Sequence, residues 1–239
     1  MDDLQEFAPG LTLRGVTPPL KLADFKLIAF DMDSTLINIE CVDEIADAAG
    51  RKAEVAAITQ AAMQGDIADY KESLRRRVAL LEGVTVQFLE QVWQERLRLN
   101  PGAEQLVAAC KAAGLKTLLV SGGFTFFTDR IRDQLGIDYT RSNVLGIKDG
   151  VLTGKLVDQA WGDIVDGGEK RTMLLQTCEH IGIEPSKAIA IGDGANDLPM
   201  MSVAGLSVAY HAKPRVREQA MVAIDEGGLD RLLELMAPA

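Results

Sequence analysis

The chain has 239 residues, 47% of them hydrophobic, and a formal net charge of −10 at pH 7. This length suits one sizeable domain, or one domain with a modest insertion. The acidic balance argues against nucleic acid or an anionic membrane as a partner, because both require a basic surface. It is compatible with a small anionic substrate, since a few local cations can outweigh the overall charge.

No apolar stretch of the sequence is long enough to cross a bilayer. Residues 1–6 are acidic and lack the basic start and apolar core of a signal peptide, so we expect a cytoplasmic protein. The cysteines, Cys41, Cys110 and Cys178, are far apart, which indicates reduced thiols. Two histidines are too few for a histidine-based metal cluster.

The predicted secondary structure changes twice in the first quarter of the chain. Residues 1–24 contain three prolines and little periodicity, which predicts an extended N-terminal arm. An apolar run predicts a buried strand at about 26–31. From about residue 40, apolar residues recur at helical spacing for roughly 60 residues. We therefore predict a helical cap, residues 39–99, inserted into a catalytic core made of residues 25–38 and 100–239.

Beyond Pro101, strands and helices are expected to alternate. The elements are a helix over 103–113, a strand over 116–120, a helix ending at Gly136, a hairpin over 143–157 with Asp149-Gly150 as its turn, a helix over 169–182, a strand over 187–192, a helix near 197–204, a strand over 206–209 and a closing helix from about 228. This order predicts an α/β fold, with a Rossmann-like parallel sheet and helices on both faces.

Two aspartates, Asp31 and Asp33, end the first predicted strand. Both side chains point to the same side of an extended backbone, so their charges repel. The pair makes sense if a cation lies between them, or if one carboxylate is a nucleophile and the other a proton donor. The structural alternative is a pair of acids at a helix N-terminus, which contributes about 1 kcal/mol at most.

Two more polar clusters follow later strands. Ser121-Gly122-Gly123 is predicted to join a strand to a helix and to approach an anion closely. The segment from Gly192 to Asp197 carries oxygen ligands that suit a hard cation. Lys170 begins the predicted helix that precedes this segment. A lysine at a helix N-terminus is unfavourable for the helix dipole, which indicates a functional role as an anchor. Taken singly, an ordinary tight turn and a solvated lysine are the alternatives. Ligands bind beyond the carboxyl ends of parallel strands, where all three clusters are expected.

The order of these motifs resembles the four signature motifs of the haloacid dehalogenase superfamily: Asp-x-Asp-x-Thr, a serine, a lysine, and Gly-Asp-x-x-x-Asp. The resemblance covers nearly the whole chain from Lys26. Its more specific part is similar to the phosphoserine phosphatase family and includes the helical insertion. The stretches that carry it are 31–36, 40–46, 73–78, 121–124 and 192–197.

This resemblance implies a Mg²⁺-dependent phosphatase that hydrolyses O-phospho-L-serine to L-serine and phosphate, the last step of serine biosynthesis. Asp31 would be the nucleophile that forms an aspartyl-phosphate, and Asp33 the proton donor and acceptor. Mg²⁺ would be bound by Asp31, Asp193 and the main-chain carbonyl of Asp33.

The substrate-binding residues that the resemblance implies are Glu40, Arg77, Ser121, Gly122, Lys170 and Asn196, with Asp197 in a supporting role. Glu40 would take the ammonium of the substrate and Arg77 its carboxylate, while Arg75 and Arg76 are expected to be solvated or ion-paired. On the first cap helix we expect a mainly solvated acidic face, made of Asp43, Glu44 and Asp47.

Two other functions stay open. A phosphotransferase that passes the phosphoryl group to homoserine would use the same scaffold, and spacing cannot separate it from a phosphatase. A receiver-type phosphoacceptor module also uses an aspartate, a metal, a hydroxyl and a lysine, but it lacks an acid two residues after the nucleophile and a helical cap. The expected partner is phosphoserine, with no nucleic acid and no membrane; a homodimer is left open.

Overall fold

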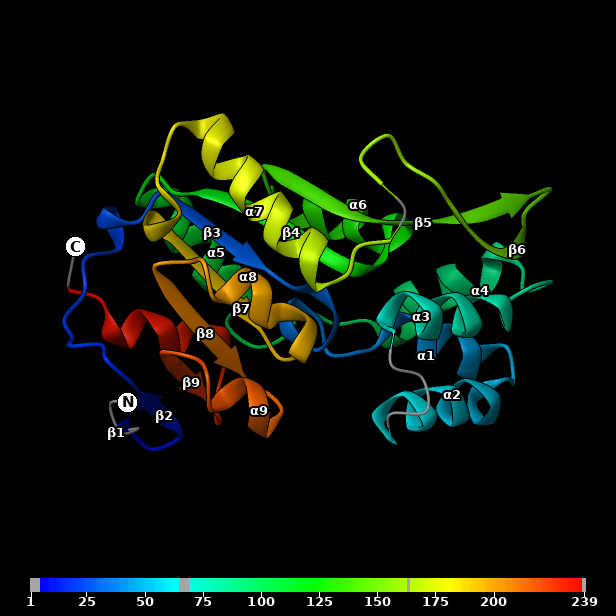
Figure 1. Cartoon of the computed structure of the whole chain (residues 1–239), viewed down its shortest axis with the longest axis horizontal. Helices are drawn as coiled ribbons and strands as arrows, with labels where there is room; N and C mark the ends of the chain where they lie inside the picture. The colour runs from blue at the N-terminus through cyan, green and yellow to red at the C-terminus, as the bar shows by residue number, and fades with distance from the viewer. Residues whose placement is uncertain (1–4, 65–68, 163, 238–239) are drawn as a thin grey trace.

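The computed structural model describes residues 5–64, 69–162 and 164–237 (Figure 1). Within these residues, nine strands form one sheet in the order β1-β2-β9-β8-β7-β3-β4-β5-β6. The strands are β1 (Gln5–Ala8), β2 (Leu11–Leu13), β3 (Leu27–Phe30), β4 (Lys116–Phe124), β5 (Tyr139–Lys148), β6 (Val151–Val157), β7 (Ala188–Gly192), β8 (Leu206–Tyr210) and β9 (Val222–Ile224). Neighbours from β9 to β5 are parallel, and β1, β2 and β6 are antiparallel additions at the two edges.

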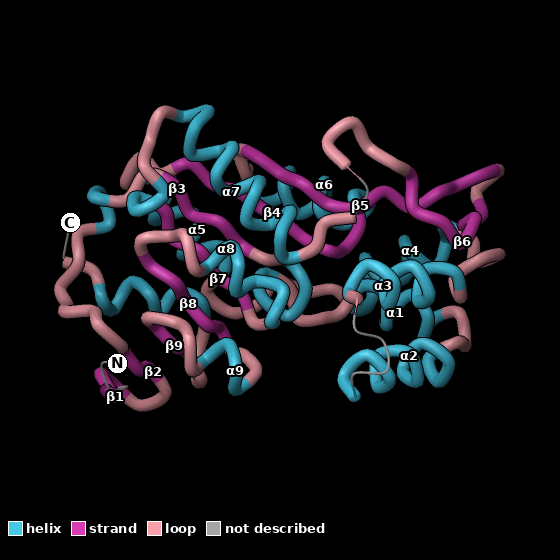
Figure 2. Tube along the Cα trace, in the orientation of Figure 1, coloured by secondary structure: helices cyan, strands magenta, loops and turns pink. Residues whose placement is uncertain are grey.

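Helices cover both faces of the parallel strands (Figure 2). The helices are α1 (Cys41–Ala48), α2 (Lys52–Gln64), α3 (Tyr70–Ala79), α4 (Val86–Gln91), α5 (Ala103–Ala112), α6 (Thr125–Leu135), α7 (Gly167–Ile181), α8 (Leu198–Met201) and α9 (Pro214–Arg217), with shorter helical turns η1 (Leu22–Asp24), η2 (Met32–Leu36), η3 (Val92–Arg96), η4 (Pro185–Lys187), η5 (Ala195–Asp197) and η6 (Leu229–Leu235). The predicted α/β class, with a parallel sheet between two helical layers, is confirmed.

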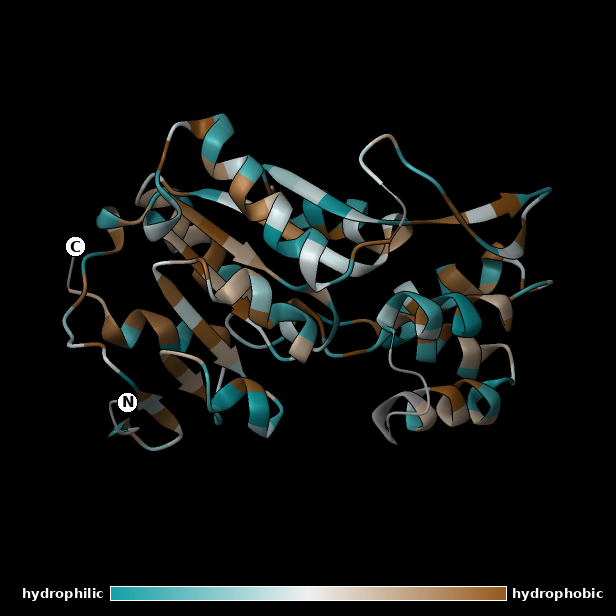
Figure 3. Cartoon of the chain, in the orientation of Figure 1, coloured by the Kyte–Doolittle hydropathy of each residue, from teal (hydrophilic) through white to brown (hydrophobic). Residues whose placement is uncertain are grey.

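The central strand β3 shows why the sheet is buried on both sides. Its four residues, Leu27 to Phe30, are fully buried, and alternate side chains enter opposite cores. Ile28 and Phe30 pack in the core that contains residues of α5 and α6, while Leu27 and Ala29 pack in the core that contains residues of α7, α8 and α9. Figure 3 shows that hydrophobic residues are concentrated on the strands, whereas α3 and α9 are mainly hydrophilic.

The predicted helical block lies together at one end of the molecule, beyond the carboxyl ends of the parallel strands (Figure 1). It contains α1 to α4 and η3, and the β5–β6 hairpin reaches alongside it. Backbone hydrogen bonds join the hairpin to the segment after α3: Gly83 N donates to Leu152 O at 3.0 Å, and Leu152 N donates to Val84 O at 2.7 Å. The division into a core and a cap at residues 39 and 99 stays a proposal.

Three predictions about local structure were wrong. Residues 5–13 of the expected arm form the β1–β2 hairpin, because β2 finds a partner in β9, a three-residue strand too short to be recognised by periodicity. Strand β4 continues through Ser121-Gly122-Gly123 to Phe124 and does not turn there into a helix. The closing helix is the tighter 3₁₀ form, η6. The described residues include no helix with the length and apolarity needed to cross a bilayer.

Candidate active site

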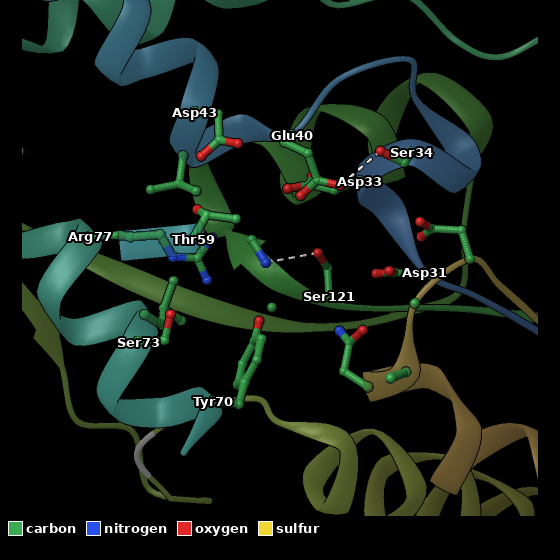
Figure 4. Close-up of a pocket in the computed structure, with 18 of the residues that line it drawn as sticks. Asp31, Asp33, Ser34, Glu40, Asp43, Thr59, Tyr70, Ser73, Arg77 and Ser121 are labelled. Carbon is green, nitrogen blue, oxygen red and sulfur yellow. Dashed lines mark hydrogen bonds between the residues drawn. The ribbon is translucent and has the colours of Figure 1, made fainter. Parts of the chain in front are cut away.

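The polar clusters after β3, in the last part of β4 and after β7 meet at one edge of the sheet, as predicted. They border a cavity of about 670 Å³, whose other side is formed by α1 and α3 (Figure 4). The predicted site residues that line this cavity are Asp31, Asp33, Glu40, Arg77, Ser121, Gly122, Asp193 and Asn196. Residues more than 150 positions apart in the chain are therefore brought to one site.

Asp31 directly follows β3 and is 6% exposed. Its Oδ1 accepts hydrogen bonds from the Met32 amide and from Lys170 Nζ, both at 2.7 Å. Burial, followed by the negative charge of Asp197, raises the pKa of Asp31 well above its usual value, and Lys170 offsets this only in part. Asp31 therefore needs more positive charge nearby to act as an ionised nucleophile.

Lys170 lies beneath the cavity and is fully buried between two carboxylates. Its Nζ donates to Asp197 Oδ1 at 2.7 Å, in addition to Asp31. Burial by itself lowers the pKa of Lys170, but the two carboxylates outweigh it and raise the pKa above its ordinary value. These ion pairs explain why a lysine occupies the first turn of α7. Its contact with a phosphate stays a prediction.

Asp197 braces the turn that follows β7. Its Oδ2 accepts from the amides of Asp193 and Gly194, at 3.1 and 3.0 Å, while Oδ1 accepts from Lys170. A Cβ atom added at Gly192 would lie 2.3 Å from Asp197 Cγ, so only glycine leaves room for this carboxylate. Both carboxylate oxygens of Asp197 thus already accept hydrogen bonds, and its supporting role stays a prediction.

The site has the donor set of a hard divalent cation. Carboxylate oxygens of Asp31, Asp193 and Asp197 lie within 4.8 Å of one another, and all three residues are buried. Lys170 is paired with two of these acids and Lys213 also acts on Asp193, so the three acids still outnumber the two lysines. Burial, followed by the charge of Asp197, raises the pKa of Asp193 to about 6. Because Asp197 is committed, Asp31 and Asp193 are the carboxylates available to a metal such as Mg²⁺.

Asp33 turns its carboxylate away from this cluster and toward the cap. Its Oδ2 accepts from the Cys41 amide at the start of α1, at 3.0 Å. Its Oδ1 is buried and has no hydrogen-bond partner among the described residues. Burial, followed by the negative charge of Glu40, raises the pKa of Asp33 to about 7. With Oδ2 accepting, a proton on Asp33 belongs on Oδ1, where it is free to be donated.

The segment at the end of β4 that was predicted to approach an anion has extended rather than helical backbone. Gly123 N donates to Ser121 Oγ at 2.9 Å, which leaves the Ser121 hydroxyl proton free. Asn143 on β5 holds the strand here: its Nδ2 donates to Gly122 O at 2.8 Å, and its Oδ1 accepts from Val165 N at 2.9 Å. These side-chain bonds replace the strand pairing that is interrupted between Val120 and Phe124.

The cap supplies charged groups at the other end of the cavity (Figure 4). Arg77 on α3 faces the cavity, and its Nε is buried with no partner among the described residues. Its neighbours Arg75 and Arg76 are exposed, and Arg76 pairs with Glu72 at 2.7 Å, as predicted for the solvated side of the helix. Glu40 accepts from Ser34 Oγ at 2.7 Å.

One expectation about α1 was wrong. Asp43 lines the cavity instead of the solvated face, because the first turn of α1 points toward the sheet edge. The other two acids do face away from the cavity, although they are not simply solvated. Arg96 of η3 pairs with Glu44 at 2.8 Å and with Asp47.

Comparison with known proteins identifies the family of the chain. A family model for haloacid dehalogenase-like hydrolases matches residues 25–205. The phosphoserine phosphatase of a Polaromonas species is 78% identical over 231 residues, which is 97% of this chain and 98% of that protein. The corresponding enzyme of Albidiferax ferrireducens is 73% identical over the same length and coverage. The chain belongs to the phosphoserine phosphatase family of the haloacid dehalogenase superfamily.

The fold agrees with this family. A solved "Phospho-Aspartyl Intermediate Analogue of Phosphoserine phosphatase" has a TM-score of 0.81 and 38% identity to this chain, covering 89% of this chain and 99% of that one. Asp43, Tyr70 and Asn143 are among the residues that border or brace the cavity and that the sequence did not predict as site residues. Each lies inside an ordinary helix or strand pattern, so only its direction in the folded chain reveals it.

Tyr70 packs closely against Gly122 at the phosphoserine phosphatase site. A Cβ atom at Gly122 would lie 2.1 Å from Tyr70 Oη, and burial raises the pKa of this phenol to about 12, so it stays protonated. We expect Gly122→Ala to lower kcat/KM by about 10- to 100-fold, the equivalent of 1–3 kcal/mol of overpacking. Steady-state kinetics of phosphate release measures this effect.

The same clash defines a control. Without the Tyr70 hydroxyl, the closest atoms to the new methyl would be Tyr70 Cζ at 3.3 Å and Val165 O at 3.4 Å. Tyr70→Phe should therefore reduce the effect of Gly122→Ala to a few-fold. An equal loss in both backgrounds would show that the methyl group acts on something other than Tyr70.

Proposed function

We infer that this chain is a phosphoserine phosphatase, which hydrolyses O-phospho-L-serine to L-serine and phosphate. The observation that carries this function is a cavity with two chemically different ends. Buried acids and Lys170 form the end that suits a phosphoryl group. Glu40 and Arg77, whose Nε has no partner among the described residues, form the end that suits an amino acid. The relatives, named as phosphoserine phosphatases, support the same substrate.

We propose that Asp31 performs the covalent step. One of its carboxylate oxygens attacks phosphorus, and the bond between phosphorus and the serine oxygen breaks to leave an aspartyl-phosphate. Lys170 and the Met32 amide hold the carboxylate in place through Oδ1. A family member solved as a phospho-aspartyl intermediate analogue supports this route.

Asp33 moves the proton in both halves of the reaction. In the first half its protonated Oδ1 gives a proton to the departing serine oxygen, since Oδ2 is held by the Cys41 amide. In the second half the ionised Asp33 takes a proton from a water molecule that attacks phosphorus. Phosphate then leaves, and Asp31 is restored.

Ser121, the Gly122 amide, Asn196 and Lys170 are the groups proposed to hold the phosphoryl oxygens. Two unit charges 4 Å apart interact by about 4 kcal/mol at an effective dielectric near 20, so a carboxylate cannot approach a phosphate dianion without positive charge. Asp31, Asp193 and the Asp33 carbonyl would hold Mg²⁺. Bound there, Mg²⁺ would neutralise part of the charge on the acids and on the phosphate.

The direct test is phosphate release from a panel of phosphomonoesters with Mg²⁺ and with a chelator. We expect multiple turnovers with phosphoserine, loss of activity on chelation, and recovery when Mg²⁺ is returned. Transfer of one phosphoryl group to each chain, without repeated release of phosphate, would favour a phosphoacceptor module. The same assay with added homoserine tests phosphotransfer, because a phosphotransferase would form phosphohomoserine and release less free phosphate.

Arg77 is proposed to bind the substrate carboxylate. Losing a hydrogen bond to a charged group costs about 1.5–3 kcal/mol, so Arg77→Ala should lower kcat/KM for phosphoserine by about 10- to 100-fold. The effect should be largely absent with p-nitrophenyl phosphate, which has no carboxylate. Both rates come from initial-velocity measurements.

Arg76→Ala is the matched control for this prediction. It removes the same side chain one residue earlier on α3, from an exposed position where Arg76 pairs with Glu72. We expect kcat/KM for phosphoserine to change by less than about two-fold, as is usual for an exposed pair. Equal losses of kcat/KM in the two variants would mean that Arg77 does not bind the substrate.

A further inference from the structure

Asp43 is a charged group on the cavity wall that the proposed reaction does not use. It lies in the first turn of α1, one turn after Glu40, and lines the same cavity as Glu40 and Arg77. Its Oδ1 is buried and has no hydrogen-bond partner among the described residues. Figure 4 shows the Asp43 side chain on α1, near Glu40, and Arg77 reaching toward the same space from α3.

The surroundings of Asp43 differ from those of the other acids of α1. The neighbouring acids of α1, Glu44 and Asp47, are both paired with Arg96, outside the cavity lining. Asp43 has no such hydrogen-bonded pair among the described residues, although Arg77 is near enough to influence it electrostatically. A buried acceptor without a donor is costly, so an unpaired Asp43 is expected to serve a ligand.

The charges at this end of the cavity favour one class of substrate. The charged residues of α1, α3 and their N-caps that line the cavity are the acids Glu40, Asp43 and Asp69 and the base Arg77, so this end carries an excess of negative charge when they are ionised. The amino-acid part of phosphoserine is a zwitterion with no net charge. The same skeleton with a hydroxyl in place of the ammonium, as in 3-phosphoglycerate, carries one negative charge there and is repelled.

We propose that Asp43 determines substrate specificity: together with Glu40 it makes the cavity accept phosphomonoesters that carry an ammonium and reject phosphorylated hydroxy acids of the same shape. The proposal rests on the function inferred above. One acid would suffice to attract an ammonium, as Glu40 does. The second acid, Asp43, repels a competitor such as 3-phosphoglycerate, which has the same phosphate and carboxylate as phosphoserine but no ammonium.

The test compares phosphoserine with 3-phosphoglycerate in the intact chain and in Asp43→Asn. Asparagine keeps the shape of the side chain and removes its charge. We expect the ratio of the two kcat/KM values, phosphoserine over 3-phosphoglycerate, to fall about 10-fold. The change should come mainly from a lower KM for 3-phosphoglycerate, because a repulsive charge has been removed, with kcat for phosphoserine within about three-fold.

Two variants serve as controls. Glu44→Gln makes the same charge change on the same helix but outside the cavity, and it should leave the ratio unchanged. Asp43→Glu keeps the charge and should restore most of the selectivity. Activity toward p-nitrophenyl phosphate, which has neither ammonium nor carboxylate, reports whether each variant is folded and competent.

The outcomes separate this proposal from the inferred function. If the unmodified chain does not hydrolyse phosphoserine, the inferred function fails. If the chain is selective and Asp43→Asn keeps the full ratio while remaining active on p-nitrophenyl phosphate, the role of Asp43 is wrong. An equal fall in kcat for all three substrates, not restored by Asp43→Glu, would assign Asp43 to the structure of the cap and would also overturn the proposal.

Discussion

Asp31→Asn is expected to lower kcat for phosphoserine by roughly 10⁴-fold or more, the scale seen when a catalytic nucleophile is removed. An amide oxygen does not attack phosphorus at a useful rate, so no aspartyl-phosphate forms. The fold should survive, because Lys170 keeps its ion pair with Asp197 at 2.7 Å and asparagine can still accept from the Met32 amide. Phosphate release measures the loss, and thermal unfolding checks the fold.

A second measurement makes this result specific to the nucleophile. Acid-quenched wild-type chain should show the added mass of one phosphoryl group on the peptide that contains Asp31, and the variant should show none. Asp193→Asn is the matched control: it removes a proposed metal ligand, so part of its loss should be recovered at high Mg²⁺. Full activity of Asp31→Asn would contradict the covalent mechanism. Recovery of its activity at high Mg²⁺ would mean that Asp31 acts as a metal ligand and not as the nucleophile.

Asp33→Asn is expected to lower kcat for phosphoserine by about 10²- to 10⁴-fold, the usual contribution of a general acid and base. The serine oxygen is a poor leaving group and needs the proton that Asp33 Oδ1 is placed to donate. p-Nitrophenolate leaves without a proton, so its first step should be nearly unimpaired. The second step still lacks its base, and aspartyl-phosphate should therefore accumulate.

Rapid mixing with p-nitrophenyl phosphate tests this division of labour. Asp33→Asn should release about one equivalent of p-nitrophenol per chain in a burst, followed by slow turnover. Absence of the burst, with the same loss for both substrates, would mean that Asp33 acts on the attack itself rather than on the proton. The raised pKa of Asp33, about 7, supports the proton role because both protonation states are then accessible near neutral pH.

Local pattern was enough to predict the elements that carry the chemistry. The buried run at Leu27–Phe30 and the turn at Asp149-Gly150 follow from short-range rules: four consecutive apolar residues require a sheet covered on both faces, and both turn residues adopt positive φ. The course of β4 through Ser121-Gly122-Gly123 does not follow from such rules. It depends on Asn143, a residue of the next strand, whose amide holds Gly122 in extended backbone.

The sequence by itself determined the α/β class, the order of the motifs and the acids proposed for catalysis, because residue type and spacing within one motif carry that information. Tertiary structure alone decided which charges meet. Lys170 lies between Asp31 and Asp197 because α7 starts beside the ends of β3 and β7. Asp43 faces the cavity because α1 presents its first turn to the sheet edge. The direction of a side chain across a cavity depends on how elements pack, and no single segment of sequence specifies it.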